Sequence, residues 1–357
     1  MKIALVYDRI NKWGGAERVL LALHELFPKA PLFTAVYSPD KAKWAKIFPK
    51  VITSFLQHIP YFQDKHELLG TFTPIAFEQF DFCGYDLVIS VTSEAAKGIL
   101  TGPKTRHLCY MLTPTRYLWS GYDLYFRNFF LRKISRPIIN YLKRWDRFAA
   151  FRPDKIIAIS SEVQKRVELY YGRPSQIIFP PVNLPKKVKE TRQGNFFLVV
   201  SRVVPYKRVD LAVRAFNKLG LPLYIVGGGS QTWKLKLMAK KNIKFLGEIS
   251  DRKLDYYYNH CQALIFPQEE DFGITAVEAQ AHGAPVIAFK AGGALDTMVD
   301  GVTGIFFSKQ EVDSLVSAVA QFKRAGFSRS RLVESAKRFS KARFKKEFKK
   351  IVYGDTK

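Results

Sequence analysis

Four charged residues in the second half of the chain have the types and spacing to hold a small anionic ligand. Arg202 and Lys207 lie five residues apart, directly after the apolar run Phe196–Val200. At the carboxyl end of a buried strand, both cations could reach one diphosphate and would stabilise it as a leaving group without a divalent ion. The alternative is ordinary surface charge, which a basic protein carries in many places.

The two carboxylates of this group belong to the motif Glu270-x7-Glu278, which follows the apolar run Ala263–Phe266. A helix is predicted to begin near Gly273, so that Glu270 lies in a loop and Glu278 lies about one and a half turns into the helix. Carboxylates beside the free amides of the helix start suit a ligand that carries both hydroxyl groups and phosphate. A solvated acidic helix start is the alternative, since the helix dipole favours it.

Glycines stand where predicted strands end. Gly14 and Gly15 separate a first strand from a first helix, where the backbone can approach a ligand and offer free N–H groups to an anion. The segment lacks the G-x-G-x-x-G pattern, which disfavours dinucleotide binding, and a tight turn is the alternative. In the second half, glycines follow four successive strands and predict one ligand-binding edge. These are Gly227–Gly229, Gly247, Gly273 and Gly292–Gly293.

The elements that must position these residues alternate between strand and helix. Helical periodicity runs through Gly15–Leu26, and short apolar runs recur along the chain. This alternation predicts an α/β fold with doubly wound parallel sheets covered by helices on both faces. The predicted strands are Ile3–Tyr7, Leu87–Val91, His107–Met111, Ile156–Ile159, Phe196–Val200, Leu223–Val226, Ile243–Leu246, Ala263–Phe266 and Pro285–Ala288.

Length and composition predict two packed domains. The chain has 357 residues, 47% of them hydrophobic, which suffices for two ordinary cores. Three prolines and a basic run in Phe179–Lys187 suit a stiff linker, so we place the domain boundary at Pro180-Pro181. We therefore expect an N-terminal domain over 1–180 and a C-terminal domain that begins at residue 181.

Charge and cysteine usage indicate the partners and the compartment. The formal net charge of +26 favours an anionic partner or surface. The three cysteines form no C-x-x-C pair, and the six histidines do not fall at zinc-ligand spacing with them, so we expect a reducing compartment and no metal. No apolar run approaches the roughly 18 residues of a membrane span, and the start resembles a strand rather than a signal peptide. These features predict a cytoplasmic protein, with peripheral membrane binding left open.

Two segments interleave basic and aromatic residues. Arg127–Arg152 and Lys337–Lys350 each carry eight basic residues, and Phe339, Phe344 and Phe348 recur at roughly helical spacing in the second. One interpretation is a solvated basic face on a helix whose apolar stripe packs into the core. The other is docking on an anionic membrane, to which each basic residue near the lipid contributes on the order of 1 kcal/mol.

Together these motifs resemble glycosyltransferase family 4. The resemblance is carried by Arg202-x4-Lys207, Pro180-Pro181-Val182, Phe245-Leu246-Gly247, Glu270-x7-Glu278, Gly292-Gly293 and Asp300–Gly304, in that order. Four segments of the first half, Thr53–Gln57, Tyr85–Ser90, Ala96–Gly98 and Thr113–Trp119, resemble the WbaZ-like mannosyltransferase branch. The resemblance implies a GT-B fold, with two Rossmann-like domains facing a cleft. It also implies a C-terminal helix that crosses back to the first domain, here 337–357, which ends the second domain at 336.

The resemblance also implies a reaction: retaining, metal-independent transfer of a sugar from a nucleotide donor. Arg202, Lys207 and Glu270 would be catalytic, the two cations on the diphosphate and Glu270 on the donor sugar. Glu278 would bind the ribose hydroxyls, and Gly15 would approach the diphosphate. The remaining donor-binding positions would be Gly14, Gly247, Glu248, Ile249, Asp271, Phe272, Gly273 and Ile274.

GDP-mannose is the leading donor by resemblance to the branch, and UDP- and dTDP-sugars remain alternatives. The acceptor would be a lipid-linked or cell-surface glycan, and no cofactor is expected. Many relatives have His-Thr-Pro where this chain reads Leu112-Thr113-Pro114, so the hydrogen bond of that histidine is lost here. A non-catalytic sugar-nucleotide-binding subunit is therefore an alternative function. Nucleic-acid binding is disfavoured by the acidic pair Glu270 and Glu278 in the proposed site.

Overall fold

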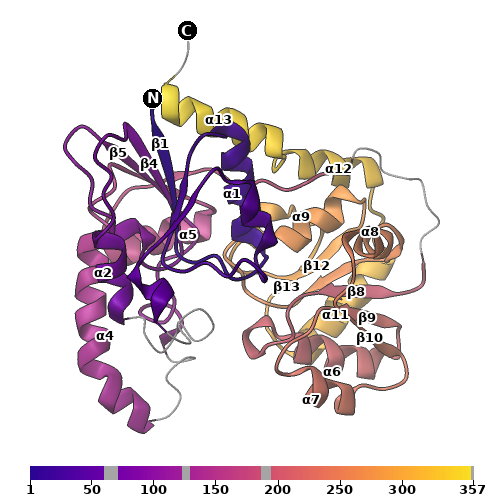
Figure 1. Ribbon diagram of the computed structural model, residues 1–357. Coiled ribbons are helices and arrows are strands. Elements are labelled where there is room, and N and C mark those ends of the chain that lie inside the picture. Colours follow the sequence, from indigo (N-terminus) through magenta and orange to yellow (C-terminus); the bar gives the residue numbers. More distant parts are fainter. Residues whose placement is uncertain (60–70, 123–128, 186–193, 355–357) are drawn as a thin grey trace. The chain divides into compact units, whose positions relative to one another are not determined.

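The computed structural model describes residues 1–59, 71–122, 129–185 and 194–354 (Figure 1). The chain divides into two compact units, which we describe separately. The first unit comprises 1–180 with 345–357, and the second comprises 181–344. Lys186 and Lys187 of the expected linker, and Arg127 of the first basic segment, lie outside the described residues.

The first unit is built on a parallel sheet. Within the described residues, seven strands pair in the order β3-β2-β1-β4-β5-β6-β7, and β1 pairs with both β2 and β4. The strands are β1 Ile3–Tyr7, β2 Leu32–Thr34, β3 Val51–Thr53, β4 Leu87–Thr92, β5 Arg106–Met111, β6 Lys155–Ala158 and β7 Gln176–Ile177. The helices are α1 Gly15–Leu26, α2 Thr73–Glu78, α4 Phe129–Ala149 and α5 Ser161–Tyr171, with 3₁₀ turns at Lys43–Ile47, Phe55–His58 and Ala96–Gly98.

The second unit repeats this plan with six described strands in the order β10-β9-β8-β11-β12-β13, again parallel. Its strands are β8 Phe197–Val200, β9 Leu223–Val226, β10 Ile243–Gly247, β11 Leu264–Phe266, β12 Val286–Phe289 and β13 Gly304–Phe307. Its helices are α6 Val209–Leu219, α7 Thr232–Met238, α8 Asp251–His260, α9 Ile274–Ala281, α10 Ala294–Thr297, α11 Val312–Arg324 and α12 Arg329–Lys337. Both strand orders are those of Rossmann-like sheets, so the predicted fold class is confirmed.

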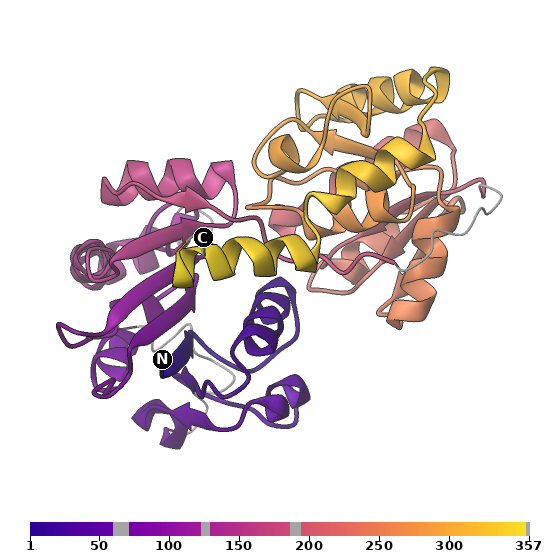
Figure 2. The same ribbon diagram turned by 90° about the horizontal axis from the view of Figure 1, so that it is seen from above.

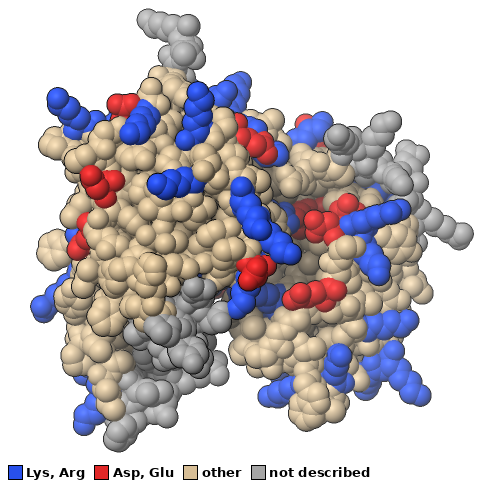
Figure 3. Space-filling view, viewed as in Figure 1, with Lys and Arg blue, Asp and Glu red and all other residues tan. Residues whose placement is uncertain are grey.

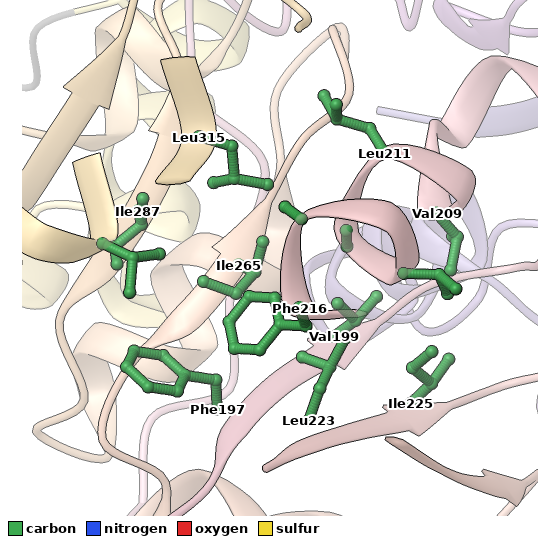
Figure 4. Close-up of a cluster of buried hydrophobic side chains, with 14 of the residues drawn as sticks. Phe197, Val199, Val209, Leu211, Phe216, Leu223, Ile225, Ile265, Ile287 and Leu315 are labelled. Carbon is green, nitrogen blue, oxygen red and sulfur yellow. The ribbon is translucent and has the colours of Figure 1, made fainter. Parts of the chain in front are cut away.

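Burial on both faces of the sheet explains why the strands of the second unit read as continuous apolar runs. Along β8, Phe197 and Val199 pack on one face with α6 and α11, where Phe216 and Leu315 are buried (Figure 4). The alternate residue Leu198 packs on the opposite face, with side chains from α8 and α9. Successive side chains of a strand point to opposite faces, so a strand covered on both must be apolar throughout.

The predicted C-terminal helix is wrong in its bounds. Two helices, α12 Arg329–Lys337 and α13 Lys341–Tyr353, are found where a single helix was expected over 337–357. The break occurs at Phe339, which is fully buried and whose carbonyl accepts the backbone N–H of Val182 at 2.9 Å. The chain turns between the two helices at Phe339, which is held by this hydrogen bond and by its burial.

The described C-terminal residues from Lys345 onward belong to the first unit. Within that unit, this part of α13 lies beside α1 (Figure 2), where Lys345 forms an ion pair with Glu25. Phe348 is fully buried, with its ring centroid 6.1 Å from that of Tyr110 on β5. Arg106 donates to the backbone carbonyl of Val352 at 3.0 Å. The end of α13 is therefore part of the packed core of the first unit.

Candidate functional site

The charged residues of the second unit come from the two strands at which the strand order reverses. The loop after β8 carries Arg202 and Lys207, and the loop after β11 carries Glu270. β8 and β11 are neighbours in the sheet although β9 and β10 lie between them in sequence. Ligands of open parallel sheets bind outside the carboxyl ends of the strands at such a switch point. The topology thus places the predicted residues where a ligand site is expected.

Lys207 and Glu270 form an ion pair between these two loops. Their side chains are 13% and 17% exposed, so the pair is partly shielded from water. Gln268 is buried and orients its amide nitrogen toward the same carboxylate oxygen of Glu270, at 3.3 Å. The ammonium group and the amide together fix one oxygen of this carboxylate.

Arg202 lies in the same loop as Lys207 and is the more exposed of the two. Its guanidinium group donates a hydrogen bond to the hydroxyl of Tyr206 and lies 5.9 Å from the centre of that ring. The ammonium of Lys207 lies 5.1 Å from the centre of the same ring. Tyr206 therefore brings the two predicted phosphate-binding cations together.

Gln310 ties the two loops to each other. Its side-chain oxygen accepts from Arg208 at 2.9 Å, and its amide nitrogen donates to the carbonyl of Pro267 at 2.8 Å. Arg208 adopts a left-handed conformation with φ of 51°, which costs a non-glycine residue roughly 1–2 kcal/mol. This backbone conformation separates the 3₁₀ turn Pro205–Lys207 from α6, and the contacts of Gln310 hold it in place.

Glu278 lies on α9, as predicted, and takes a partner of its own. The helix begins at Ile274 after Gly273, whose φ of 90° falls in the region that favours glycine. Glu278 is largely buried, and one of its carboxylate oxygens accepts a hydrogen bond from the hydroxyl of Tyr258 on α8 at 3.0 Å. This hydrogen bond orients the carboxylate.

The glycine pair after β12 lets the Glu270 loop pack closely. A Cβ atom on Gly292 would collide with the carbonyl oxygen of Glu270, and one on Gly293 would collide with the backbone of Phe272. The N–H of Gly293 donates to the carbonyl of Glu270 at 2.8 Å. The Phe272 ring is buried and lies 5.4 Å from that of Phe339, so it packs in the interior of the second unit. Asp271 is half-buried beside it.

A cavity of about 680 Å³ lies next to the loop predicted to meet a nucleobase. Gly247 ends β10 with φ of 68°, and its carbonyl accepts the N–H of Gly227 at 2.8 Å. Glu248 is exposed, whereas Ile249 lines the cavity. The other lining residues come from the end of β10, the loop after it and α8: Leu246, Ser250, Arg252, Lys253, Tyr256 and Tyr257. The cavity is mixed in character, with aromatic, apolar and cationic side chains.

Gly14 and Gly15 stand at the start of α1 in the first unit, as predicted. Gly14 precedes the helix in an extended conformation that any residue adopts, so its backbone geometry does not require glycine. Leu112 follows β5, half-buried, with its N–H bonded to the carbonyl of Thr92 at 2.8 Å. His107, five residues before Leu112, is fully buried, and its ring nitrogen Nε2 lies 2.8 Å from the hydroxyl of Ser90, so it is a packed histidine.

A polar cluster that was not predicted from the sequence lies at the switch point of the first unit. Asp8, after β1, is buried and accepts hydrogen bonds from the Thr92 hydroxyl at 2.8 Å and the Ser93 N–H at 2.6 Å. Burial, with the nearby charge of Glu94, raises the pKa of Asp8 above its ordinary value. Arg9 pairs with Glu94 at 2.6 Å. These residues are far apart in sequence, so only the pairing of β1 with β4 brings them together.

The sequence analysis also did not single out Tyr206, Tyr258, Gln268 and Gln310. Tyr206 lies inside the Arg202-x4-Lys207 motif and Gln268 lies two residues before Glu270, so proximity to the motifs could have drawn attention to both. Tyr258 and Gln310 come from other elements, and no spacing in the sequence connects them with the site.

Comparison with known proteins finds a family match within the second unit. Residues 183–339 match the family model described as glycosyl transferases group 1. The match spans Arg202, Lys207, Glu270 and Glu278 and covers less than half of the chain.

Sequence relatives agree with this assignment. An uncharacterized glycosyltransferase of Methanocaldococcus jannaschii is 29% identical over 200 residues, which cover 55% of this chain and 57% of that protein. A GDP-mannose-dependent alpha-(1-6)-phosphatidylinositol monomannoside mannosyltransferase of Mycolicibacterium smegmatis is 32% identical over 138 residues, which cover 34% of this chain and 36% of that protein. The matched regions thus span roughly a third to just over half of these relatives.

Among solved structures, Anabaena HepE in complex with UDP-glucose superposes with a TM-score of 0.72 at 18% identity, covering 99% of both chains. WaaG, a glycosyltransferase involved in lipopolysaccharide biosynthesis, superposes with a TM-score of 0.65 at 15% identity, covering 99% of this chain and all of that one. At these identities the likeness concerns the fold, which is that of GT-B glycosyltransferases.

Proposed function

We propose that this protein is a retaining glycosyltransferase that moves a sugar from a nucleotide donor to a lipid-linked or cell-surface glycan. One observation carries the proposal: Lys207 and Glu270, 63 residues apart in sequence, pair at the switch point of the second unit. A cation for phosphate and a carboxylate for sugar hydroxyls are thereby adjacent. Both lie within the region that matches the glycosyl transferases group 1 family.

Each charged side chain then has a separate task. Lys207 and Arg202 would bind the donor diphosphate and stabilise its charge as the bond to the sugar breaks. Glu270 would accept hydrogen bonds from the donor sugar, and Glu278 would accept them from the ribose. Gly15, with Gly14, would approach the diphosphate.

The backbone amides around Phe272–Ile274 would contact the sugar and the phosphate. The segment Gly247–Ile249 would meet the nucleobase, and the cavity beside it offers apolar and aromatic walls for a flat ring. The donor would thus be held along its whole length.

Catalysis would rest on orientation and electrostatics. The departing diphosphate oxygen would take the proton of the acceptor hydroxyl, which attacks on the same face of the sugar that the diphosphate leaves, so that configuration is retained. The chain would supply the alignment and the positive charge, and no divalent metal is required.

GDP-mannose is the favoured donor. The Mycolicibacterium relative is named as GDP-mannose-dependent, and an O-antigen chain mannosyltransferase C of Escherichia coli is 28% identical over 158 residues. UDP- and dTDP-sugars are the competing donors, and HepE binds UDP-glucose in its crystal structure. The acceptor chemistry rests on the resemblance to the mannosyltransferase branch alone.

The test is a donor panel. Purified protein is given GDP-mannose, UDP-glucose, UDP-N-acetylglucosamine or a dTDP-sugar with a polyprenyl-diphosphate-linked saccharide, with and without EDTA. Nucleoside diphosphate release and the anomeric configuration of the product are measured. We expect one donor to be consumed with retention in the presence of EDTA, and Glu270→Ala and Lys207→Ala to lose most turnover. Glu269→Ala, which removes a neighbouring exposed carboxylate, is the matched control. Wild-type rates in both site variants would refute the proposed site.

Leu112 is the reason for testing one alternative function. Its side chain cannot donate the hydrogen bond of the histidine that many relatives carry there, so a sugar-nucleotide-binding subunit without turnover is the second candidate. Calorimetric binding of a donor that is never transferred or hydrolysed with any acceptor would favour that alternative.

A further inference from the structure

The two basic-aromatic segments follow the same sequence pattern but differ in where their apolar side chains lie. In the C-terminal segment, Phe339, Phe344 and Phe348 are fully buried. These aromatics are core residues and have no surface to offer a partner. The other segment forms α4, the long helix of the first unit labelled in Figure 1.

α4 carries a second apolar stripe that faces solvent. Its core-facing residues, Ile139 and Leu142 among them, are buried. On another face, Ile134, Ile138 and Tyr141 are spaced by four and three residues and are 64%, 48% and 54% exposed. Phe148, two turns beyond Tyr141, is 73% exposed. Residues at these spacings share one side of a helix, so the four exposed side chains lie along one face, with the half-buried Trp145 between Tyr141 and Phe148.

We define these four residues, Ile134, Ile138, Tyr141 and Phe148, as the α4 stripe. Single exposed apolar residues are common on any protein, but a row of large ones on one helix is typical of a surface that meets an apolar phase. In a chain of ordinary composition, such a row costs solubility unless it has a partner.

The charge of α4 indicates which partner. The helix sequence contains six basic residues and one acid, Asp146, which is buried and paired with Lys97 at 2.5 Å. Lys133 and Arg144 are exposed. Lys and Arg side chains are also abundant on the face of the protein drawn in Figure 3, where acidic side chains are fewer. An apolar row on a strongly cationic helix matches the boundary between lipid headgroups and acyl chains in an anionic bilayer.

No helix in the described parts of the chain has the length and hydrophobicity to cross a bilayer, so α4 would lie along the surface. We propose that α4 docks the first unit on an anionic membrane by inserting the α4 stripe between the lipids, while α13 takes no part in the docking. Docking is independent of the glycosyl transfer proposed above, because vesicle binding is measured without a donor or an acceptor.

The test measures partitioning of the full chain onto sedimented vesicles of phosphatidylcholine, alone or mixed with phosphatidylglycerol, at low and high salt. The docking variant is Ile138→Ser with Phe148→Ser. Its matched control is Trp233→Ser with Leu237→Ser, which removes two side chains of α7 that are 75% and 68% exposed. We expect binding of wild type to the anionic vesicles at low salt, about tenfold weaker partitioning for the docking variant, and no change for the control.

Two double variants that each remove two positive charges distinguish the contribution of α4 to vesicle binding from that of α13. Lys133→Gln with Arg144→Gln and Lys346→Gln with Lys349→Gln lower the net charge equally, and all four side chains are exposed. The α4 change should weaken partitioning by about fivefold per residue, as expected for basic residues close to the lipid. The α13 change should weaken it by less than about twofold, through the long-range field only.

Insertion itself is followed by an environment-sensitive label at Ile138→Cys in a Cys83→Ser background. Cys83 is the exposed cysteine, while Cys109 and Cys261 are buried. The label should shift to the blue on anionic vesicles and stay unchanged with an oligonucleotide of equal charge. The proposal is overturned by any of three results: no binding of wild type to anionic vesicles, equal losses in the docking variant and its control, or the same label response to the oligonucleotide.

Discussion

Replacing Glu270 by glutamine should strengthen the binding of a nucleoside diphosphate while it abolishes transfer. Lys207 is paired with Glu270 in the structure. A diphosphate that binds Lys207 must displace this carboxylate and also meets its negative charge. Glu270→Gln keeps the shape of the side chain and removes both costs, so the lysine is free for phosphate.

The size of the effect follows from the exposure of the pair. Two unit charges 4 Å apart attract by about 1 kcal/mol in water and by about 4 kcal/mol at an effective dielectric constant of 20. The side chains of Lys207 and Glu270 are 13% and 17% exposed, which places them between these limits. The displaced carboxylate also regains water, which offsets part of the attraction. We therefore expect a gain of about 1.4 kcal/mol, or about tenfold in affinity.

Calorimetry at fixed ionic strength measures this gain with GDP, UDP and inorganic diphosphate, the last of which isolates the phosphate contact. Glu269→Gln is the matched control because it removes the same charge from the adjacent, exposed position. In a Lys207→Ala background the gain should vanish, since a double-mutant cycle reports only the shared interaction. Unchanged or weaker diphosphate binding in Glu270→Gln would refute the reasoning. An equal gain in Glu269→Gln would mean that the gain in affinity comes from the change in net charge and not from the release of Lys207.

Three further predictions concern other parts of the structure. Gln310→Ala should lower kcat about tenfold, because the loops lose their common anchor, and should also lower the thermal midpoint, because its hydrogen bonds to Arg208 and Pro267 are removed. Lys309→Ala, at an exposed neighbour, should retain the wild-type rate and midpoint. Gly293→Ala should lower the free energy of unfolding in urea by about 1–3 kcal/mol through its collision with Phe272, and wild-type stability would contradict the close packing. Burial, with the charge of Arg152, lowers the pKa of His107 to about 3, so the unfolded chain binds the proton first as the pH falls. Stability should therefore drop by up to about 1.4 kcal/mol per pH unit below about 6.5, less steeply in His107→Gln, as urea unfolding at several pH values would measure.

Much of the fold could be predicted because the longer strands are buried on both faces. The runs at β1, β8 and β9 are apolar throughout, and the predicted run Leu87–Val91 at β4 is interrupted only by Ser90. Each of these predictions lies within one residue of the strand found. β2, β3 and β7 were not predicted, since two or three residues establish no periodicity by themselves. β11 is equally short and was predicted only because Ala263 extends it to a run of four apolar residues.

The sequence patterns could not predict which aromatic side chains are exposed to solvent. The segments that became α4 and α13 have the same mixture of basic and aromatic residues, and helical spacing of Phe344 and Phe348 was noted in the latter. In the structure those rings are in the core, while Phe148 of α4 is in solvent. Whether the apolar side chains of such a helix are buried, as in α13, or partly exposed, as in α4, depends on the neighbouring elements that pack against it. Those neighbours are distant in sequence, as the contact between Phe348 and Tyr110 illustrates.

The meeting of Lys207 with Glu270 is likewise a consequence of topology. After β8 the chain continues into α6, which packs on one face of the sheet, and after β11 it continues into α9, which packs on the other. The two loops therefore leave their strands in opposite directions, and the strand ends between them remain open to a ligand. The charges that would bind that ligand pair with each other across this opening, and Gln310 forms hydrogen bonds with both loops. A ligand that offered only phosphate would have to break this pair. A donor that also brings hydroxyl groups for Glu270 compensates the loss, so the pair itself favours a sugar nucleotide over a bare diphosphate.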